Sequence, residues 1–147
     1  MRVTMLLADA AQIAEGKLYI LGGGWSVVGP QATPMAIAIK VEVPWTEANA
    51  QHRLKLSLVD EDERPVMKIT EEGPQQPYQV TGSFEVGRPP GLPPGTPLDI
   101  PFAINMGPLS LPPGRYTWRC FIDDHTEDDW QVSFLMRSSP PPARGTS

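Results

Sequence analysis

Apolar and polar side chains alternate along most of this chain, which is the pattern of β-strands with one buried face. The clearest example covers residues 35–43, where the odd positions are all apolar: Met35, Ile37, Ile39, Val41 and Val43. Further runs of the same pattern cover residues 54–58, 98–106 and 116–122. We therefore expect each of these segments to be a strand that faces a core.

The start of the chain predicts a β-hairpin. Residues 3–13 fit a helix or a strand by periodicity, but Glu15-Gly16 is a turn signal, and residues 17–21 beyond it are typical of a paired strand. Further strands are expected over residues 66–70, 80–86 and 130–136, and a single helical turn within residues 44–51. About nine short strands predict an all-β fold, specifically an antiparallel β-sandwich of the immunoglobulin-like or C2-like type.

A proline-rich turn introduces one of the later strands. The segment Leu111-Pro112-Pro113-Gly114-Arg115-Tyr116 runs directly into the alternation over residues 116–122. This arrangement is typical of a tyrosine corner, in which the ring packs into the core and the hydroxyl bonds to backbone a few residues upstream. We therefore expect Tyr116 to have a structural role.

Length and composition indicate one folded unit. The chain has 147 residues, enough for one domain with its own core. Its 18 prolines and 13 glycines fall between apolar runs, where they mark the turns of a β protein rather than a disordered chain. We expect a single sandwich domain over residues 1–137 and a disordered tail over residues 138–147.

Charge and cysteine content limit the kinds of binding partner and the cellular location that we expect. The formal net charge of −5 argues against nucleic acid or an anionic membrane as the main partner. No segment approaches the ~20 apolar residues of a membrane span. The first ten residues imitate a secretion signal, but Asp9 ends their apolar run too early. Cys120 is the only cysteine, so no internal disulfide can form, which fits a reducing cytoplasm without requiring one. The short apolar run leads us to expect a cytoplasmic protein.

Three consecutive glycines precede a tryptophan at Gly22-Gly23-Gly24-Trp25. Successive glycine amides can form an anion-binding nest. A phosphate loop, however, leads into a helix, whereas a strand resumes here at Val27 and Val28. A glycine bulge or a close backbone approach, with Trp25 packed beside it, is the favoured interpretation.

Two acidic loop tips suggest a metal site. An up-and-down count of the strands places the turn over residues 60–63 and the turn over residues 123–129 at the same end of the sandwich. Calcium prefers oxygen ligands from several loops, so the nominated ligands are Asp60, Asp62, Asp124 and Asp128. The alternative is that both tips are ordinary solvated turns whose charges discourage edge aggregation.

The inventory for catalysis is small. His52 and His125 are the only histidines, and no serine lies in a nucleophile-elbow context. Cys120 alternates with Trp118 and Ile122 on a core face, which predicts a small buried hydrophobe. We therefore expect no enzyme activity and no cofactor.

Candidate protein-binding residues are aromatic or proline-rich. Trp45 follows a proline at a strand end, and Trp130 follows an acidic tip, so both could lie at an exposed contact surface. Pro90 and Pro93 form a PxxP pattern in the connector over residues 87–97, where the alternative is a stiff spacer. Buried tryptophan is the alternative for both aromatic residues.

Several short motifs together resemble a family of short bacterial proteins of unknown function. They are Ala8-Asp9-Ala10-Ala11, Lys17-Leu18, Leu21-Gly22-Gly23-Gly24-Trp25, Val43-Pro44-Trp45 and the segment over residues 111–116. The resemblance spans residues 2–137 and implies a bacterial cytosolic β-sandwich, with no reaction, ligand or partner attached.

These observations favour a non-enzymatic cytosolic interaction or assembly module. Its partner is expected to be a protein or a second copy, bound by edge-strand pairing or by the loop tips and the proline-rich connector. The alternative is a calcium-binding or small-ligand-binding sandwich that uses the acidic tips, and an enzyme is the third interpretation.

Overall fold

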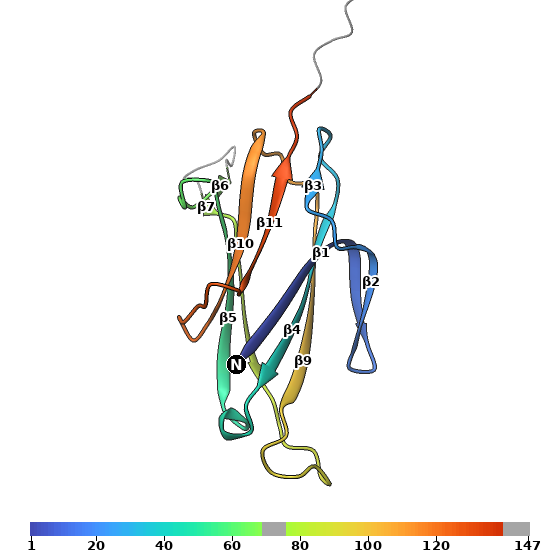
Figure 1. The fold of residues 1–147 in the computed structure, drawn as a ribbon, viewed down its shortest axis with the longest axis vertical. Helices are drawn as coiled ribbons and strands as arrows, with labels where there is room; N and C mark the ends of the chain where they lie inside the picture. The colour runs from blue at the N-terminus through green and yellow to red at the C-terminus, as the bar shows by residue number, and fades with distance from the viewer. Residues whose placement is uncertain (69–75, 140–147) are drawn as a thin grey trace, which may run out of the picture.

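The computed structural model describes residues 1–68 and 76–139, and it contains two β-sheets that pack face to face (Figure 1). The all-β sandwich predicted from the alternating pattern is confirmed. The predicted helical turn is also present, as the short 3-10 helix η1 (Trp45–Glu47). Across the described residues, no helix is long and apolar enough to cross a membrane. Residues 140–147 of the expected disordered tail lie outside the described part of the chain.

The first sheet has the strand order β2-β1-β4-β9 and is antiparallel throughout. Its strands are β1 (Arg2–Ala14), β2 (Lys17–Gly23), β4 (Met35–Val43) and β9 (Leu98–Met106). The alternation along β4 determines its buried face, because Ile37, Ile39 and Val41 point into the core and are completely buried. Ala36 and Ala38, at the intervening positions, lie on the outer face of this sheet.

The second sheet has the strand order β3-β11-β10-β5-β8. Its strands are β3 (Val27–Val28), β5 (Gln51–Val59), β8 (Gln79–Glu85), β10 (Gly114–Ile122) and β11 (Gln131–Met136). All its pairings are antiparallel except that of β3 with β11. The chain crosses between the sheets from β2 to β3, from β3 to β4, from β4 to β5, from β8 to β9 and from β9 to β10. Connections between the two sheets are typical of Greek-key β-sandwiches.

A short side hairpin replaces one predicted strand. The strand expected over residues 66–70 is reduced to β6 (Met67–Lys68), which pairs with β7 (Gln76–Pro77); residues 69 and 70 lie outside the described part. This hairpin does not pass across the sandwich, so among the described residues β8 and β9 are the only strands of the two large sheets between β5 and β10 in the chain. The predicted up-and-down count therefore contains one pass too many.

One apolar core fills the space between the sheets. Its largest fully buried side chains come from both sheets and include Leu7, Met35, Leu56, Trp118 and Phe134. Burying a large apolar side chain contributes ~1.5–3 kcal/mol, so these contacts are the main source of stability. The core is the frame on which the exposed edges and loops are held.

Tyr116 forms the predicted tyrosine corner. Its hydroxyl donates a hydrogen bond to the carbonyl of Pro112 at 2.6 Å, and its ring stacks on Phe134 with centroids 5.7 Å apart. Burial raises the pKa of the Tyr116 phenol, because the phenolate would lose its hydration. The contact closes the connection from β9 to β10.

Candidate interaction site

β1 and β2 form a hairpin in the first sheet, and β2 with the turn projects to one side of the sandwich (Figure 1). Its register runs from Ala14 opposite Lys17, next to the turn, to Ala8 opposite Gly23. The turn residues Glu15 and Gly16 have φ angles of 52° and 72°, as a two-residue hairpin turn requires. The predicted turn and hairpin are thus confirmed.

The hairpin is fixed to the outer face of the first sheet by a small apolar cluster. Ala8, Ala11, Ala36 and Ala38 are buried there, and Leu18 of β2 packs against them with Ala103. Small side chains let the second half of β1 approach the sheet closely. The Asn105 side chain on β9 donates to the Ala11 carbonyl at 2.8 Å and accepts from the Ala11 N–H at 3.1 Å. The hairpin is therefore a fixed element of the domain.

The outer strand of this hairpin exposes large apolar side chains. Leu21 is 66% exposed, Tyr19 is 52% exposed and Ile20 is 39% exposed. β2 pairs with β1 on one side and ends the sheet on the other. An apolar edge strand of this kind presents unpaired N–H and C=O groups together with apolar side chains, which makes it a template for pairing with another chain.

The other edges of the two sheets carry features that discourage pairing. β9 contains Pro101, which has no N–H to donate, and β3 has only two residues. β8 presents mainly polar side chains with Gly82 in its middle. In β2, by contrast, Lys17 at the first position is the only charged residue, and there is no proline. β2 is therefore the edge best suited to bind a strand.

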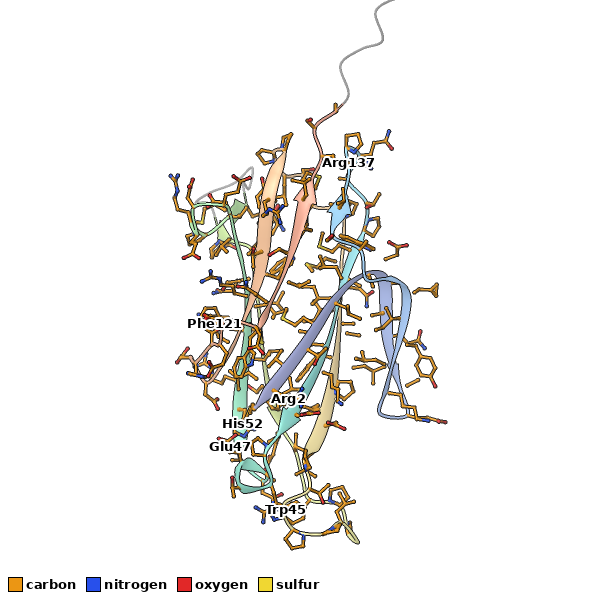
Figure 2. The ribbon with its side chains drawn as sticks, in the orientation of Figure 1. Arg2, Trp45, Glu47, His52, Phe121 and Arg137 are labelled. Carbon is orange, nitrogen blue, oxygen red and sulfur yellow. The ribbon has the colours of Figure 1, made fainter. Side chains whose placement is uncertain are left out.

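Trp45 marks a second candidate contact region, at the end of the sandwich far from Arg137 (Figure 2). It is half-buried, and the Arg88 guanidinium lies over its ring at 4.8 Å from the centroid. Arg88 also donates to the Trp45 carbonyl at 2.6 Å. Beside Trp45 is a mainly apolar cavity of about 410 Å³, lined also by Met1, Pro44 and Pro97. The structure thus brings Trp45 and the proline-rich connector together.

The PxxP prolines lie elsewhere on the connector. Pro90 and Pro93 are exposed, and neither lines the cavity beside Trp45. The Pro93 carbonyl accepts hydrogen bonds from the Thr96 N–H at 3.2 Å and from the Thr96 hydroxyl at 2.6 Å. These bonds define a local turn at the distal part of the connector.

Trp130 is not an exposed contact residue, and that prediction was wrong. It is only 4% exposed and belongs to the core. The β10–β11 register places Trp130 opposite Cys120, whose side chain points into the core, and the Cys120 N–H donates to the Trp130 carbonyl at 2.9 Å. Trp130 therefore points inward with its cross-strand neighbour.

The two acidic tips do not converge, so the predicted shared calcium site is wrong. β5 and β10 are antiparallel, with Thr117 opposite Val59 and Ile122 opposite Leu54. The tip after β5, with Asp60 and Asp62, therefore lies at the opposite end from the tip after β10, with Asp124 and Asp128. Within the described residues, no group of three or more His, Cys, Asp and Glu side chains is arranged to hold a metal ion. The short β6–β7 hairpin is the physical reason for the error.

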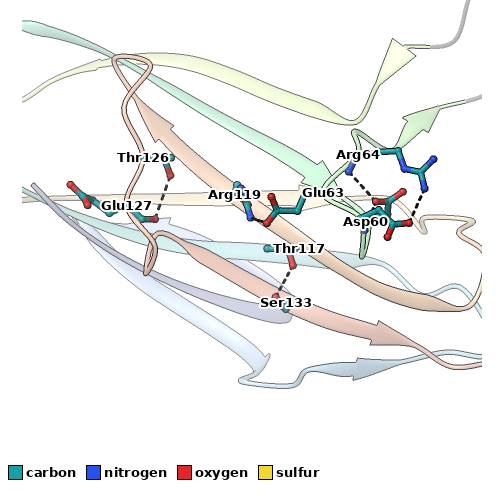
Figure 3. Close-up of polar contacts among 9 residues, drawn as sticks. Asp60, Glu63, Arg64, Thr117, Arg119, Thr126, Glu127 and Ser133 are labelled. Carbon is teal, nitrogen blue, oxygen red and sulfur yellow. Dashed lines mark hydrogen bonds and ion pairs between the residues drawn. The ribbon is translucent and has the colours of Figure 1, made fainter.

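Several tip carboxylates bind groups within the domain (Figure 3). Asp60 accepts hydrogen bonds from the N–H groups of Asp62 and Arg64, at 2.9 and 3.0 Å, and the Asp62 side chain pairs with the Arg64 guanidinium at 2.8 Å. The Glu63 carboxylate accepts a hydrogen bond from Arg119 on β10. The first tip is therefore an internally bonded turn.

The residues weighed for catalysis have structural contacts. Cys120 is completely buried, and this burial raises the pKa of its thiol to about 12. His52 is also buried; its Nδ1 lies 2.7 Å from Asp123 Oδ2 and its Nε2 lies 2.8 Å from the Glu47 carbonyl. The exposed His125 lies 2.6 Å from Glu127. The prediction of a buried hydrophobe at Cys120 is confirmed.

The glycine run makes a close approach, as the favoured interpretation expected. Gly22 has a φ of 60°, and a Cβ atom there would lie 2.2 Å from Asp9 Oδ2. The Gly24 N–H donates to the Leu7 carbonyl at 2.8 Å, so the chain stays close to β1 beyond Gly22. The run ends β2 and leads the chain toward the second sheet.

The exposed residues of β2 were missed as candidate contacts by the sequence analysis. A signal for them does exist in the chain. Leu18-Tyr19-Ile20-Leu21 is a run of consecutive apolar residues in a strand predicted to follow a two-residue turn. Such a run departs from the alternation of a strand with one solvated face, and it marks a strand with apolar groups on both faces.

Comparison with known proteins gives a family without an assigned activity. The sequence profile of a family described as "Family of unknown function (DUF6941)" matches residues 3–134. No curated protein matches the chain significantly, and no solved structure does. The match covers nearly all of the sandwich, from the first residues of β1 into β11. The chain therefore belongs to this family of unknown function.

Proposed function

We propose that this protein is a non-enzymatic cytosolic interaction module that binds a protein strand along the free edge of β2. The observation that carries the proposal is the exposure of Tyr19, Ile20 and Leu21 on an edge that lacks the usual protection. In strand addition, main-chain hydrogen bonds supply affinity and alternate side chains supply specificity. Both kinds of group are present along β2.

The rigid attachment of the hairpin supports this role. Asn105 and the alanine cluster hold the second half of β1 against the outer face of the first sheet. A partner strand would therefore meet an edge that is already ordered, so little conformational entropy is lost on binding. The non-enzymatic part of the proposal rests on the scarcity of nucleophile and base candidates and on the burial of Cys120.

The cavity beside Trp45 supports a second candidate function, the binding of a small apolar ligand. Pockets for such ligands are concave and mostly apolar, and this one combines an indole ring with proline side chains. A thermal-shift screen of small apolar compounds on the wild type and on Trp45→Ala tests it. Stabilisation of the wild type that the variant loses supports this function, and no stabilisation by any compound rejects it.

The main proposal is tested by affinity purification of tagged protein from its source cells in three forms. Wild type is compared with Leu21→Lys, which places a charge on the exposed β2 edge, and with Leu92→Lys, which places the same charge on a 38% exposed leucine of the connector. We expect a stoichiometric protein partner, or an untagged second copy, with the wild type and with Leu92→Lys but not with Leu21→Lys. Equal recovery by all three forms, or recovery of the tagged chain alone by all three, rejects β2 as the binding edge.

A further inference from the structure

We infer that the strand bound by β2 is β2 of a second copy, so that two chains form a two-fold symmetric dimer through antiparallel pairing of their hairpins. This inference rests on the proposed function of the β2 edge and names its partner. It follows from the backbone geometry of the hairpin, from its side chains and from the distribution of charge.

The turn determines which backbone groups of β2 face outward. Glu15 and Gly16 form a two-residue turn, and the pair that flanks such a turn, here Ala14 and Lys17, is a hydrogen-bonded pair. Hydrogen-bonded and non-hydrogen-bonded pairs then alternate along the ladder. The N–H and C=O groups of Leu18 and Ile20 are therefore directed away from β1, toward the open edge.

This alternation selects one register for self-pairing. A two-fold axis at Tyr19 places Leu18 of each copy opposite Ile20 of the other, so all the outward N–H and C=O groups of these residues pair in both directions. Tyr19 of one copy then lies opposite Tyr19 of the other in a non-hydrogen-bonded pair. Lys17 lies opposite Leu21. An axis at Ile20 would place Leu18 opposite Gly22, and an axis at Leu18 would place Ile20 opposite Gly16. The φ angles of Gly22 and Gly16, 60° and 72°, do not continue a strand.

The side chains complement one another in this register. Tyr19 and Leu21 of both copies gather on one face of the joined hairpins, with the Lys17 stems beside them. Leu18 and Ile20 gather on the other face. Aromatic and aliphatic side chains that face each other across paired strands stabilise the pairing. Self-pairing thus covers the apolar side chains of β2 that are exposed in a single chain.

The charges of the hairpin do not oppose this arrangement. Antiparallel pairing keeps the two Lys17 residues four positions apart along the strands, a separation of about 13 Å. The two Glu15 residues are farther apart, because they precede Lys17. The acidic tips at residues 60–63 and 123–129 belong to the loops of the second sheet. The net charge of −5 is therefore concentrated away from the paired edge.

The same geometry limits the assembly to two chains. A two-fold contact uses the β2 edge of both copies at once and closes on itself. At the other edge of this sheet, Pro101 interrupts the donors of β9. Gly22 ends the regular part of β2 after Leu21, so the shared ladder covers residues 17–21 of each chain.

Sedimentation equilibrium of the purified full-length chain gives the first test. We expect a mass of twice the 16.1 kDa of one chain, falling toward one chain on dilution, and a return to one chain at all concentrations in Leu21→Lys. A mass of one chain at every concentration for the wild type overturns the inference. The wild type could be monomeric and yet bind a different protein that Leu21→Lys does not bind in the affinity experiment. In that case the inference of a dimer is overturned, the β2 edge is still a binding site, and its partner is that protein.

Disulfide trapping tests the register and does not depend on the strength of the dimer. In Tyr19→Cys the two thiols meet at the two-fold axis, where Cα atoms of a non-hydrogen-bonded pair are about 4.5 Å apart, within the range of a disulfide. Leu21→Cys is the matched control, because it is on the same strand and more exposed, but its two thiols are about 13 Å apart along the strands. The double variant Lys17→Cys/Leu21→Cys retains Tyr19. In it, the thiol at position 17 of one copy lies opposite the thiol at position 21 of the other.

We expect mild oxidation to yield covalent dimer at least tenfold faster for Tyr19→Cys and for Lys17→Cys/Leu21→Cys than for Leu21→Cys. The native Cys120 is completely buried and does not compete. Equal rates for the three variants would show random collision and overturn the inference. Faster trapping of Leu21→Cys would establish a different register and overturn the assignment of the axis to Tyr19.

Discussion

His52 Nδ1 lies 2.7 Å from Asp123 Oδ2, and this contact joins the first residues of β5 to the turn that follows β10. The other ring nitrogen of His52 contacts the Glu47 carbonyl at 2.8 Å, so the imidazole also holds η1 (Figure 2). Asp123 has a φ of 52° and accepts a second hydrogen bond, from the Arg53 N–H at 2.9 Å. A doubly protonated ring donates to both of its partners at once.

The first prediction is that His52 makes stability depend on pH. Burial disfavours the charged ring, but the bonds to Asp123 and Glu47 outweigh burial and raise the pKa of His52 above 6.5. The bonds from His52 and Arg53 lower the pKa of Asp123 below 3.8. The contribution of His52 is therefore complete below pH 6.5 and is lost as the pH rises through its raised pKa, whereas that of Asp123 is lost as the pH falls through its lowered pKa.

Urea unfolding at a series of pH values measures this effect. At pH 6 we expect His52→Gln to lower the free energy of unfolding by about 1 kcal/mol, a modest loss because Asp123 is partly exposed. The difference between wild type and variant should shrink above pH 7. His125→Gln is the control, since His125 is exposed and its removal at pH 6 should lower the free energy of unfolding much less. An identical pH dependence in His52→Gln and the wild type would contradict the assignment.

The second prediction concerns the tyrosine corner. Tyr116→Phe keeps the stacked ring but leaves the Pro112 carbonyl without its 2.6 Å partner, so the free energy of unfolding should fall by about 1–2 kcal/mol. Tyr19→Phe removes a hydroxyl from a 52% exposed ring and should change it by less than about 0.5 kcal/mol. Chemical denaturation at a fixed, low protein concentration compares the two. Equal effects would mean that the Tyr116 hydroxyl does not stabilise the fold.

Cys120 should be chemically inert in the folded protein. It is completely buried, and its thiol pKa of about 12 leaves almost no thiolate at neutral pH. We therefore expect an aromatic disulfide reagent to label it only as fast as the domain opens, and to label it at once in denaturant. Rapid stoichiometric labelling under native conditions would show that β10 is accessible and would contradict the core described above.

Alanine substitutions at Gly16, in the hairpin turn, and at Gly22, near the end of β2, should differ in their effect on stability. Gly16→Ala has open space around it and bears only the strain of a φ of 72°, which costs about 1 kcal/mol. Gly22→Ala adds a collision with the Asp9 side chain and should cost about 2 kcal/mol. Asp9→Ala combined with Gly22→Ala should recover most of the difference, which a double-mutant cycle measures. Additive effects would show that Asp9 and Gly22 are not in contact.

Much of the fold can be predicted from local patterns in the sequence. The alternation along β4 predicts both the strand and its buried face, because a strand with one face on a core repeats every two residues. Residues 111–116 predict the Tyr116 corner because the turn and the tyrosine are adjacent in sequence. These features depend on near neighbours, so single-chain patterns are sufficient to find them.

Features that depend on the path of the whole chain were less predictable. The convergence of Asp60 with Asp124 depended on counting passes across the sandwich, and the short β6–β7 hairpin removes one pass. The burial of Trp130 follows from its pairing with Cys120, a register that the acidic turn between them does not reveal. The exposure of β2 likewise depends on which strand ends the sheet. Sheet order is a long-range property that local periodicity does not specify.

Amide hydrogen exchange at Leu18 and Ile20, measured over a range of protein concentrations, tests the central claim most directly. The account predicts that both amides are protected at high concentration, that dilution removes this protection, and that Leu21→Lys exchanges rapidly at every concentration. The Gly24 amide provides an internal reference. It donates to the Leu7 carbonyl of the same chain, so it should be protected at all concentrations. Rapid exchange of Leu18 and Ile20 at every concentration would contradict the pairing of two β2 edges.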